Sequence, residues 1–173
     1  MAAPSVVFAH FGASTDRALL AWRRASRAVF EAHAGAAPDE SAGEQAGRVY
    51  WQLVAPNHRE MARSTLLHAS ESDARAHAAT LVRRASGLTC HTFVAPAVRS
   101  IGWYLVDDDA PVVMGARWYE SRTVAREAAF RARSMLETIG REGGMPPAAA
   151  VEPEWAVTPA EPALPAPAGD ATT

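Results

Sequence analysis

Two segments of this chain repeat one strand, turn, strand and helix pattern, and this duplication constrains the fold more than any other feature. Aligned without gaps, Val49–Val54 lies over residues 101–106, so that Trp, Leu and Val coincide in the two copies. In both copies an apolar residue, a Trp and a Leu recur at every second position, which is typical of a strand with a buried face. We therefore expect two equivalent strands with Trp51 and Trp103 in a shared core.

The similarity continues into a turn and a second strand. Residues 55–58 and 107–111 contain the Asn, Asp and Pro that chain reversal requires. Second strands are expected near residues 60–65 and 112–118.

With one inserted residue in the first copy, the buried stripes of two helices also coincide. The matched positions are Ala74, Ala78, Leu81 and Ala85 in the first copy and Ala125, Ala129, Ala132 and Leu136 in the second. Ser70 or Ser72 in the first copy and Ser121 in the second are the expected N-caps. Gly87 and Gly140 are expected just beyond the helix ends.

The segment before the repeats predicts a strand and an amphipathic helix. Residues 5–11 are rich in β-branched and aromatic residues and precede Gly12, with Ser14 or Thr15 as the expected N-cap. A buried helix stripe then recurs at three- and four-residue spacing: Leu19, Trp22, Ala25 and Val29. The strand and helix are expected to pack on the core.

These elements predict an α+β fold, with a two-layer sheet that carries its helices on one face. The expected organisation is a strand–helix unit at 1–35, a linker at 36–47, repeats at 48–94 and 95–140, and a disordered Pro/Ala-rich acidic tail at 141–173. The order of elements in residues 5–94 is also that of a ferredoxin-like plait, which stays open as an alternative.

Composition excludes several kinds of chemistry. All 17 basic residues are arginine, so Schiff-base and P-loop lysines are ruled out. Cys90 is the only cysteine, which excludes an intramolecular disulfide and a thiolate metal cluster. No stretch approaches the length of a membrane span, and the N-terminus does not have the form of a secretory signal. A cytoplasmic protein without membrane contact is expected.

No motif predicts a catalytic, metal or cofactor site. The six histidines are not paired at ligand spacing, and the acidic run 107–109 is interpreted as a solvated turn. Ser64 lies outside any Gly-x-Ser-x-Gly sequence, so an enzyme that uses Ser64 or His58 is the least favoured reading. We expect a protein that is not an enzyme and that has no cofactor.

The run from Asn57 to Ser64 resembles the YegP-like bacterial domain of unknown function, a β-β-α unit found in tandem. That family's pattern is an aromatic strand, an Asn-Gly turn, an apolar strand, a Ser, a Tyr three residues later, and a helix. The first copy keeps Asn57 and Ser64 but has Leu67 for the Tyr, and the second keeps Tyr119. The resemblance implies a tandem architecture and no particular activity.

The leading functional hypothesis is a non-catalytic interaction module, because repeats build surfaces and no polar cluster suggests chemistry. An edge strand offers a route to a homodimer. The alternative is an Arg-mediated nucleic-acid or ribosome-associated factor. The candidate interaction residues are Arg126 and Arg133 on the second repeat helix and Trp155 in the acidic tail.

Overall fold

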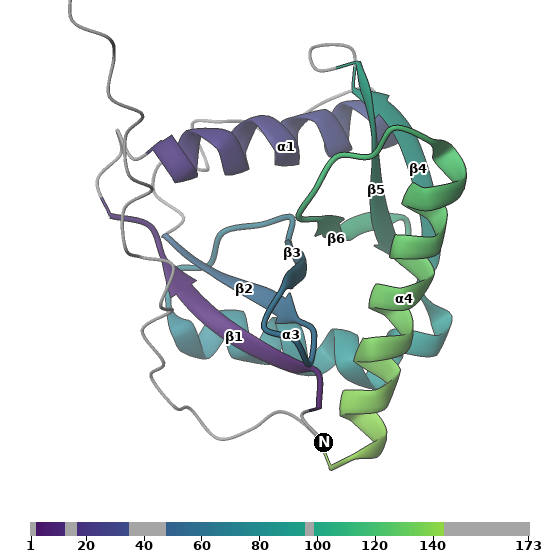
Figure 1. Ribbon diagram of the computed structural model, residues 1–173. Helices are drawn as coiled ribbons and strands as arrows, with labels where there is room; N and C mark the ends of the chain where they lie inside the picture. Colours follow the sequence, from purple (N-terminus) through teal and green to yellow (C-terminus); the bar gives the residue numbers. More distant parts are fainter. Residues whose placement is uncertain (1–2, 13–16, 35–47, 96–98, 144–173) are drawn as a thin grey trace, which may run out of the picture.

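The computed structural model describes residues 3–12, 17–34, 48–95 and 99–143. The predicted linker and all but the first residues of the predicted tail lie outside these ranges, as do Ser14 and Thr15. Within them the order of elements is β1 (Ser5–His10), α1 (Arg17–Ala34), β2 (Val49–Val54), β3 (Glu60–Ser64), α3 (Glu71–Arg84), β4 (Thr89–Ala95), β5 (Ser100–Asp107), β6 (Ala110–Gly115) and α4 (Arg122–Arg141) (Figure 1). A short 3₁₀ turn, Ala85–Gly87, follows α3.

All six strands form one antiparallel sheet in the order β1-β2-β3-β6-β5-β4. The two repeats meet where β3 pairs with β6. From either edge of the sheet, three strands follow one another in chain order up to this central pair. β1 and β4 therefore occupy equivalent edges, so the repeated unit has three strands and a helix and is longer than predicted. We call β1, β2, β3 and α3 the first half, and β4, β5, β6 and α4 the second half.

The ferredoxin-like plait is ruled out by the strand pairing. In that fold the two strands joined by a helix run parallel with another strand between them, whereas β1 and β2, which flank α1, are direct antiparallel neighbours. Both halves also have a register shift at the same point, after Leu53 in β2 and after Leu105 in β5. A shared bulge position supports the duplication that the sequence predicted.

Helix α1 is inserted into a hairpin of the first half. His10 at the end of β1 pairs with Val49 at the start of β2, although 38 residues separate them in the sequence. At the equivalent place in the second half, Ala95 of β4 pairs with Ser100 of β5 across a short connection. The chain therefore leaves the sheet, forms α1, and returns to the neighbouring position.

The sheet is covered on both faces. Trp51, Leu53, Trp103 and Leu105 pack in one core with α3 and α4, whereas the alternate residues Tyr50, Tyr104 and Val106 pack in a second core with α1. In Figure 1, α1 and α3 lie on opposite sides of β1 and β2. The α+β sheet and the placement of both repeat helices on one face are confirmed, but α1 adds a third layer to the predicted two.

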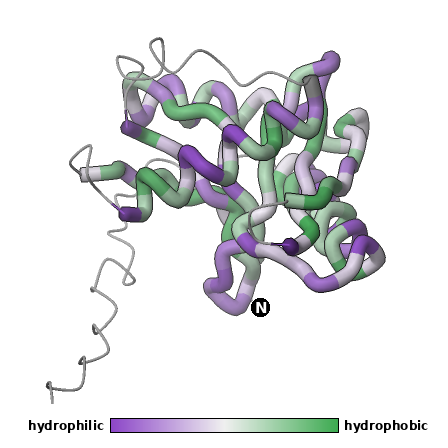
Figure 2. The backbone as a smooth tube through the Cα atoms, turned by 90° about the horizontal axis from the view of Figure 1, so that it is seen from above, coloured by the Kyte–Doolittle hydropathy of each residue, from purple (hydrophilic) through white to green (hydrophobic). Residues whose placement is uncertain are grey.

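Each helix has one apolar face, and green and purple segments alternate along the helical turns in Figure 2. Helix α1 is fixed by polar as well as apolar contacts. The indole Nε1 of Trp22 donates to the backbone oxygen of Ser64 at 3.2 Å, and the Ser26 hydroxyl donates to that of Thr65 at 2.7 Å. These bonds satisfy carbonyl groups at the end of β3 that α1 shields from water.

The predicted helix caps are partly confirmed. The side chains of Ser70 and Ser121 accept from the third residue of α3 and α4, as N-cap residues do. Gly87 lies beyond α3, but Gly140 lies inside the last turn of α4. A Cβ at Gly140 would lie 3.1 Å from the backbone oxygen of Val82, so this glycine permits a close approach to α3 rather than ending α4.

The second predicted strand pair is confirmed with one shorter boundary. β6 ends at Gly115 rather than near residue 118, and the chain then bridges from Tyr119 to Ile101. The first half has the same bridge from His68 to Val49. His68 is therefore the structural counterpart of Tyr119. The sequence comparison instead matched Leu67 to that position.

Gly115 should be intolerant of a side chain, because Trp103 lies against it. A Cβ at this position would lie 2.6 Å from Nε1 and 2.8 Å from Cε2 of Trp103. We expect Gly115→Ala to lower the free energy of unfolding by about 1–3 kcal/mol, the usual cost of overpacking a core. Gly87→Ala is the matched control, because no atom lies within 4 Å of its Cβ position. Urea denaturation of both variants measures the difference, and equal stabilities would contradict this packing.

Candidate binding groove beside α4

An open pocket of about 460 Å³ lies between α4 and the β2–β3 hairpin. We call it the α4 groove. The hairpin contributes Ala55, Pro56, Asn57, Arg59, Glu60 and Met61; α4 contributes Val124, Glu127, Ala128, Arg131 and Met135; and Arg117 and Tyr119 complete the lining. The wall is thus partly apolar and partly charged, and three of its side chains are arginines.

The duplication explains why this groove is open. The equivalent groove lies between α3 and the β5–β6 turn, and Arg84 of α3 bridges it. Arg84 contacts Asp107 at 3.1 Å and Asp108 at 2.6 Å. Met135 occupies the equivalent position of α4 and forms no ion pair, so the second-half helix leaves the groove unbridged.

A second difference lies on the helix wall of the groove. In the first half His77 lies over Trp51 and accepts a hydrogen bond on Nδ1 from the indole Nε1 at 3.0 Å. Ala128, which lines the groove, occupies the equivalent position in α4, so a methyl group stands there in place of the imidazole. Trp103, the counterpart of Trp51, has a buried Nε1 with no hydrogen-bond partner among the described residues.

The three arginines of the α4 groove have no charged counterparts at the equivalent positions of the other half. The duplication places Ala110 opposite Arg59, Leu66 opposite Arg117 and Thr80 opposite Arg131. All three arginines are exposed, and none makes a side-chain hydrogen bond or ion pair within the ranges that the structure describes. Their charges are thus available to a bound group.

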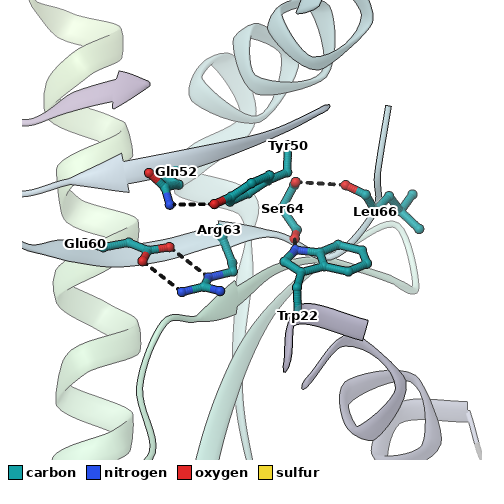
Figure 3. A network of polar contacts seen from close by, with 7 residues as sticks. All are labelled: Trp22, Tyr50, Gln52, Glu60, Arg63, Ser64 and Leu66. Carbon is teal, nitrogen blue, oxygen red and sulfur yellow. Dashed lines mark hydrogen bonds and ion pairs between the residues drawn. The ribbon is translucent and has the colours of Figure 1, made fainter. Parts of the chain in front are cut away.

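The lining also contains two carboxylates, Glu60 and Glu127, and their surroundings differ. Glu60 is held by Arg63 in the same strand, with Nε–Oε1 and Nη2–Oε2 distances of 2.8 Å (Figure 3). Burial raises the pKa of the Glu60 carboxyl, and the nearby charges of Arg63 and Arg117 oppose that rise. Glu127 is exposed on α4.

The face of the sheet behind this pair is also polar. Gln52 lies opposite Arg63 in the β2–β3 ladder and donates to the Tyr50 hydroxyl at 3.0 Å (Figure 3). Gln52 is 2 % exposed, so its amide depends on these partners. Gln52 also hydrogen-bonds the Glu60 carboxylate, so it helps to hold that group at the edge of the α4 groove.

The two predicted interaction residues of α4 lie outside the lining of the α4 groove. Arg126 is exposed on α4, outside the groove lining. Arg133 donates to the backbone oxygen of Leu88 at 3.2 Å, lies 3.6 Å from Glu137 and stacks over Phe130. Its guanidinium therefore has a structural role. Trp155 lies outside the described residues.

The other residues considered in the sequence lie apart. Ser64 is fully buried and donates to the backbone oxygen of Leu66, whereas His58 is exposed in the β2–β3 turn with φ of 61°. No group of three or more His, Cys, Asp or Glu side chains in the described ranges could hold a metal ion. Asp107 and Asp108 instead pair with Arg84.

Sequence reasoning missed the α4 groove, because its arginines come from three separate segments. A signal was nevertheless present in the aligned repeats. Where only one copy carries a charge, as at Arg59 against Ala110 or at Arg131 against Thr80, the charged residue is a candidate for a specialised surface.

No helix in the part of the chain that the structure describes combines the length and the apolar character needed to cross a membrane. Comparisons with protein-family models, curated proteins and solved structures gave no significant match to this chain.

Proposed function

We propose that this protein is a non-catalytic binding module, and that its α4 groove binds an acidic segment of a partner protein. One observation carries the proposal: three arginines without ion-pair partners among the described residues line one of two equivalent grooves of a duplicated fold, and Arg84 bridges the other. The resemblance to the YegP-like domain stays a prediction and adds only an expected architecture.

The lining determines the chemistry of the ligand. Arginine pairs with carboxylates through two parallel hydrogen bonds, so Arg59, Arg117 and Arg131 favour a ligand with two or three carboxylate groups. Val124 is 50 % exposed and, together with Met61 and Met135, offers an apolar wall. Methionine adapts its shape to bound apolar groups. An acidic peptide with one large apolar side chain matches both features.

A peptide fits this groove better than a nucleic acid does. Glu60 and Glu127 lie in the same lining as the arginines and would repel a continuous phosphate backbone. The volume of about 460 Å³ is that of a pocket for a few residues rather than of a long track. A nucleic-acid ligand is therefore the outcome that would replace this proposal.

Charge reversal in the groove should remove binding. The probe is a fluorescein-labelled hexapeptide with four glutamates and a central tryptophan, measured by anisotropy. We expect Arg117→Glu combined with Arg131→Glu to weaken its affinity at least tenfold, because two favourable charges become unfavourable. Added salt should weaken wild-type binding, since exposed charges are screened.

Two controls make the result specific. Arg126→Glu changes the same charge on the same helix outside the groove and should alter affinity less than twofold. A peptide with glutamine in place of every glutamate should not bind. The proposal fails if the acidic peptide does not bind, if Arg126→Glu weakens binding as much as the groove variant, or if single-stranded DNA binds in its place.

A further inference from the structure

We propose that residues 152–157 of the same chain, Glu-Pro-Glu-Trp-Ala-Val, are a ligand of the α4 groove and compete there with the partner protein. This inference rests on the proposed function, because it assigns an internal occupant to the same site. It commits to the chain's own segment rather than to a second copy.

Charge complementarity supports this assignment. Residues 146–173 contain four acids, Glu152, Glu154, Glu161 and Asp170, and no basic residue. The α4 groove has the opposite charge, with three arginines that pair with no carboxylate in the described residues. Only in residues 152–157 do two of the acids lie within three positions of a large apolar side chain, Trp155.

The apolar part of the groove matches that side chain. Met61, Val124 and Met135 line the groove together with the small side chain of Ala128. In the equivalent place of the first half an aromatic ring, the imidazole of His77, packs at 6.1 Å from the ring centre of Trp51. An indole from Trp155 would place an aromatic group in the α4 groove at the position that corresponds to His77 in the first half.

The length of the chain permits the contact. The last described residue is Gly143, two residues after the end of α4, and Trp155 follows 12 residues later in the sequence. Twelve residues span up to about 40 Å when extended. Returning along α4 from Gly143 to Val124, the far end of the lining, covers about 29 Å at the rise of a helix. The segment can therefore reach every part of the groove without a second chain.

Attachment raises the effective concentration of the segment to about the millimolar range, so even a weak contact would occupy the groove. A partner would then have to displace it. The test uses the full chain with Glu152→Gln, Glu154→Gln and Trp155→Ala combined, and the acidic hexapeptide as probe. We expect the combined variant to bind the probe at least fivefold more tightly than wild type. Glu161→Gln is the matched control and should leave the affinity unchanged.

A second measurement separates the two proposals. Methyl NMR signals of Met61 and Met135 report on the groove without any added ligand, and they should shift in the combined variant but not in Glu161→Gln. If the probe binds wild type and the variant equally and the methyl signals stay fixed, the internal ligand is wrong and the proposed function stands. If the methyl signals shift but no probe binds, the internal ligand stands and the partner proposal fails. Methyl shifts that depend on protein concentration would overturn the same-chain assignment.

Discussion

Replacing Trp51 by alanine should lower the free energy of unfolding by about 3–5 kcal/mol, because the indole is fully buried and its removal leaves a large cavity. Since domains of this size are stable by about 5–15 kcal/mol, the variant should unfold at a much lower urea concentration. Trp118→Ala is the control, because Trp118 is 40 % exposed. Its cost should be clearly smaller.

The two matched tryptophans allow a sharper comparison. Trp51→Phe and Trp103→Phe remove the same atoms from equivalent positions, but only Trp51 donates a hydrogen bond, to His77. Trp51→Phe breaks that bond, whereas Trp103→Phe removes a buried donor that has no acceptor. We expect Trp51→Phe to be more destabilising by about 1–2 kcal/mol, the usual scale for one buried hydrogen bond. Equal midpoints in urea would mean that the His77 contact contributes nothing.

The parts of the fold that the sequence predicts are those with a local pattern of apolar or capping residues. An apolar pattern repeats around Trp51 and Trp103 and predicts both in the core, and both are at most 1 % exposed. The N-caps Ser70 and Ser121 were recognised for the same reason, since a cap depends on a few neighbouring residues.

The equivalence of β1 and β4 could not be predicted, because only the pairing of the strands shows it and their sequences do not. SVVFAH and TCHTFVA share no aligned pattern, yet each strand lies at an edge beside the first strand of its repeat. The third layer did leave a signal. Both β2 and β5 carry a run of large apolar or aromatic residues on both faces, which is typical of strands covered on two sides.

The α4 groove was out of reach for a different reason. The duplication is visible in what the two copies share, whereas the groove is made by residues in which they differ. Met135 in place of Arg84 leaves one groove unbridged, and Ala128 in place of His77 leaves it unfilled. Which of two equivalent grooves is open depends on contacts between distant segments, and these become visible only when the hairpins are placed against the opposite helices.

Acid should destabilise this fold through His77. Burial, reinforced by the nearby His68, lowers the pKa of His77 to about 4, below its ordinary value of 6.5. Burial also lowers the pKa of His68, although the charge of Asp73 opposes that change. A physical reason is visible in the hydrogen bonding: Nδ1 of His77 accepts from Trp51, so a second proton on the ring would displace that bond. The ring centres of the two histidines are only 4.9 Å apart, so a charge on one disfavours a charge on the other.

The direction of the pH dependence follows from proton uptake on unfolding. Between about pH 6.5 and 4 the unfolded chain protonates His77 while the folded chain does not, so the free energy of unfolding falls as pH falls through this window. The loss should be on the order of 2–3 kcal/mol, with full stability above pH 6.5. His77→Gln keeps an acceptor for Trp51 but cannot titrate, so urea midpoints measured from pH 7.5 to 4 should decline less steeply. His10→Gln, at the exposed end of β1, is the control and should retain the wild-type slope. If His77→Gln also keeps the wild-type slope, the acid sensitivity of the protein has another source. The protonation of His77 would then have no effect on the free energy of unfolding.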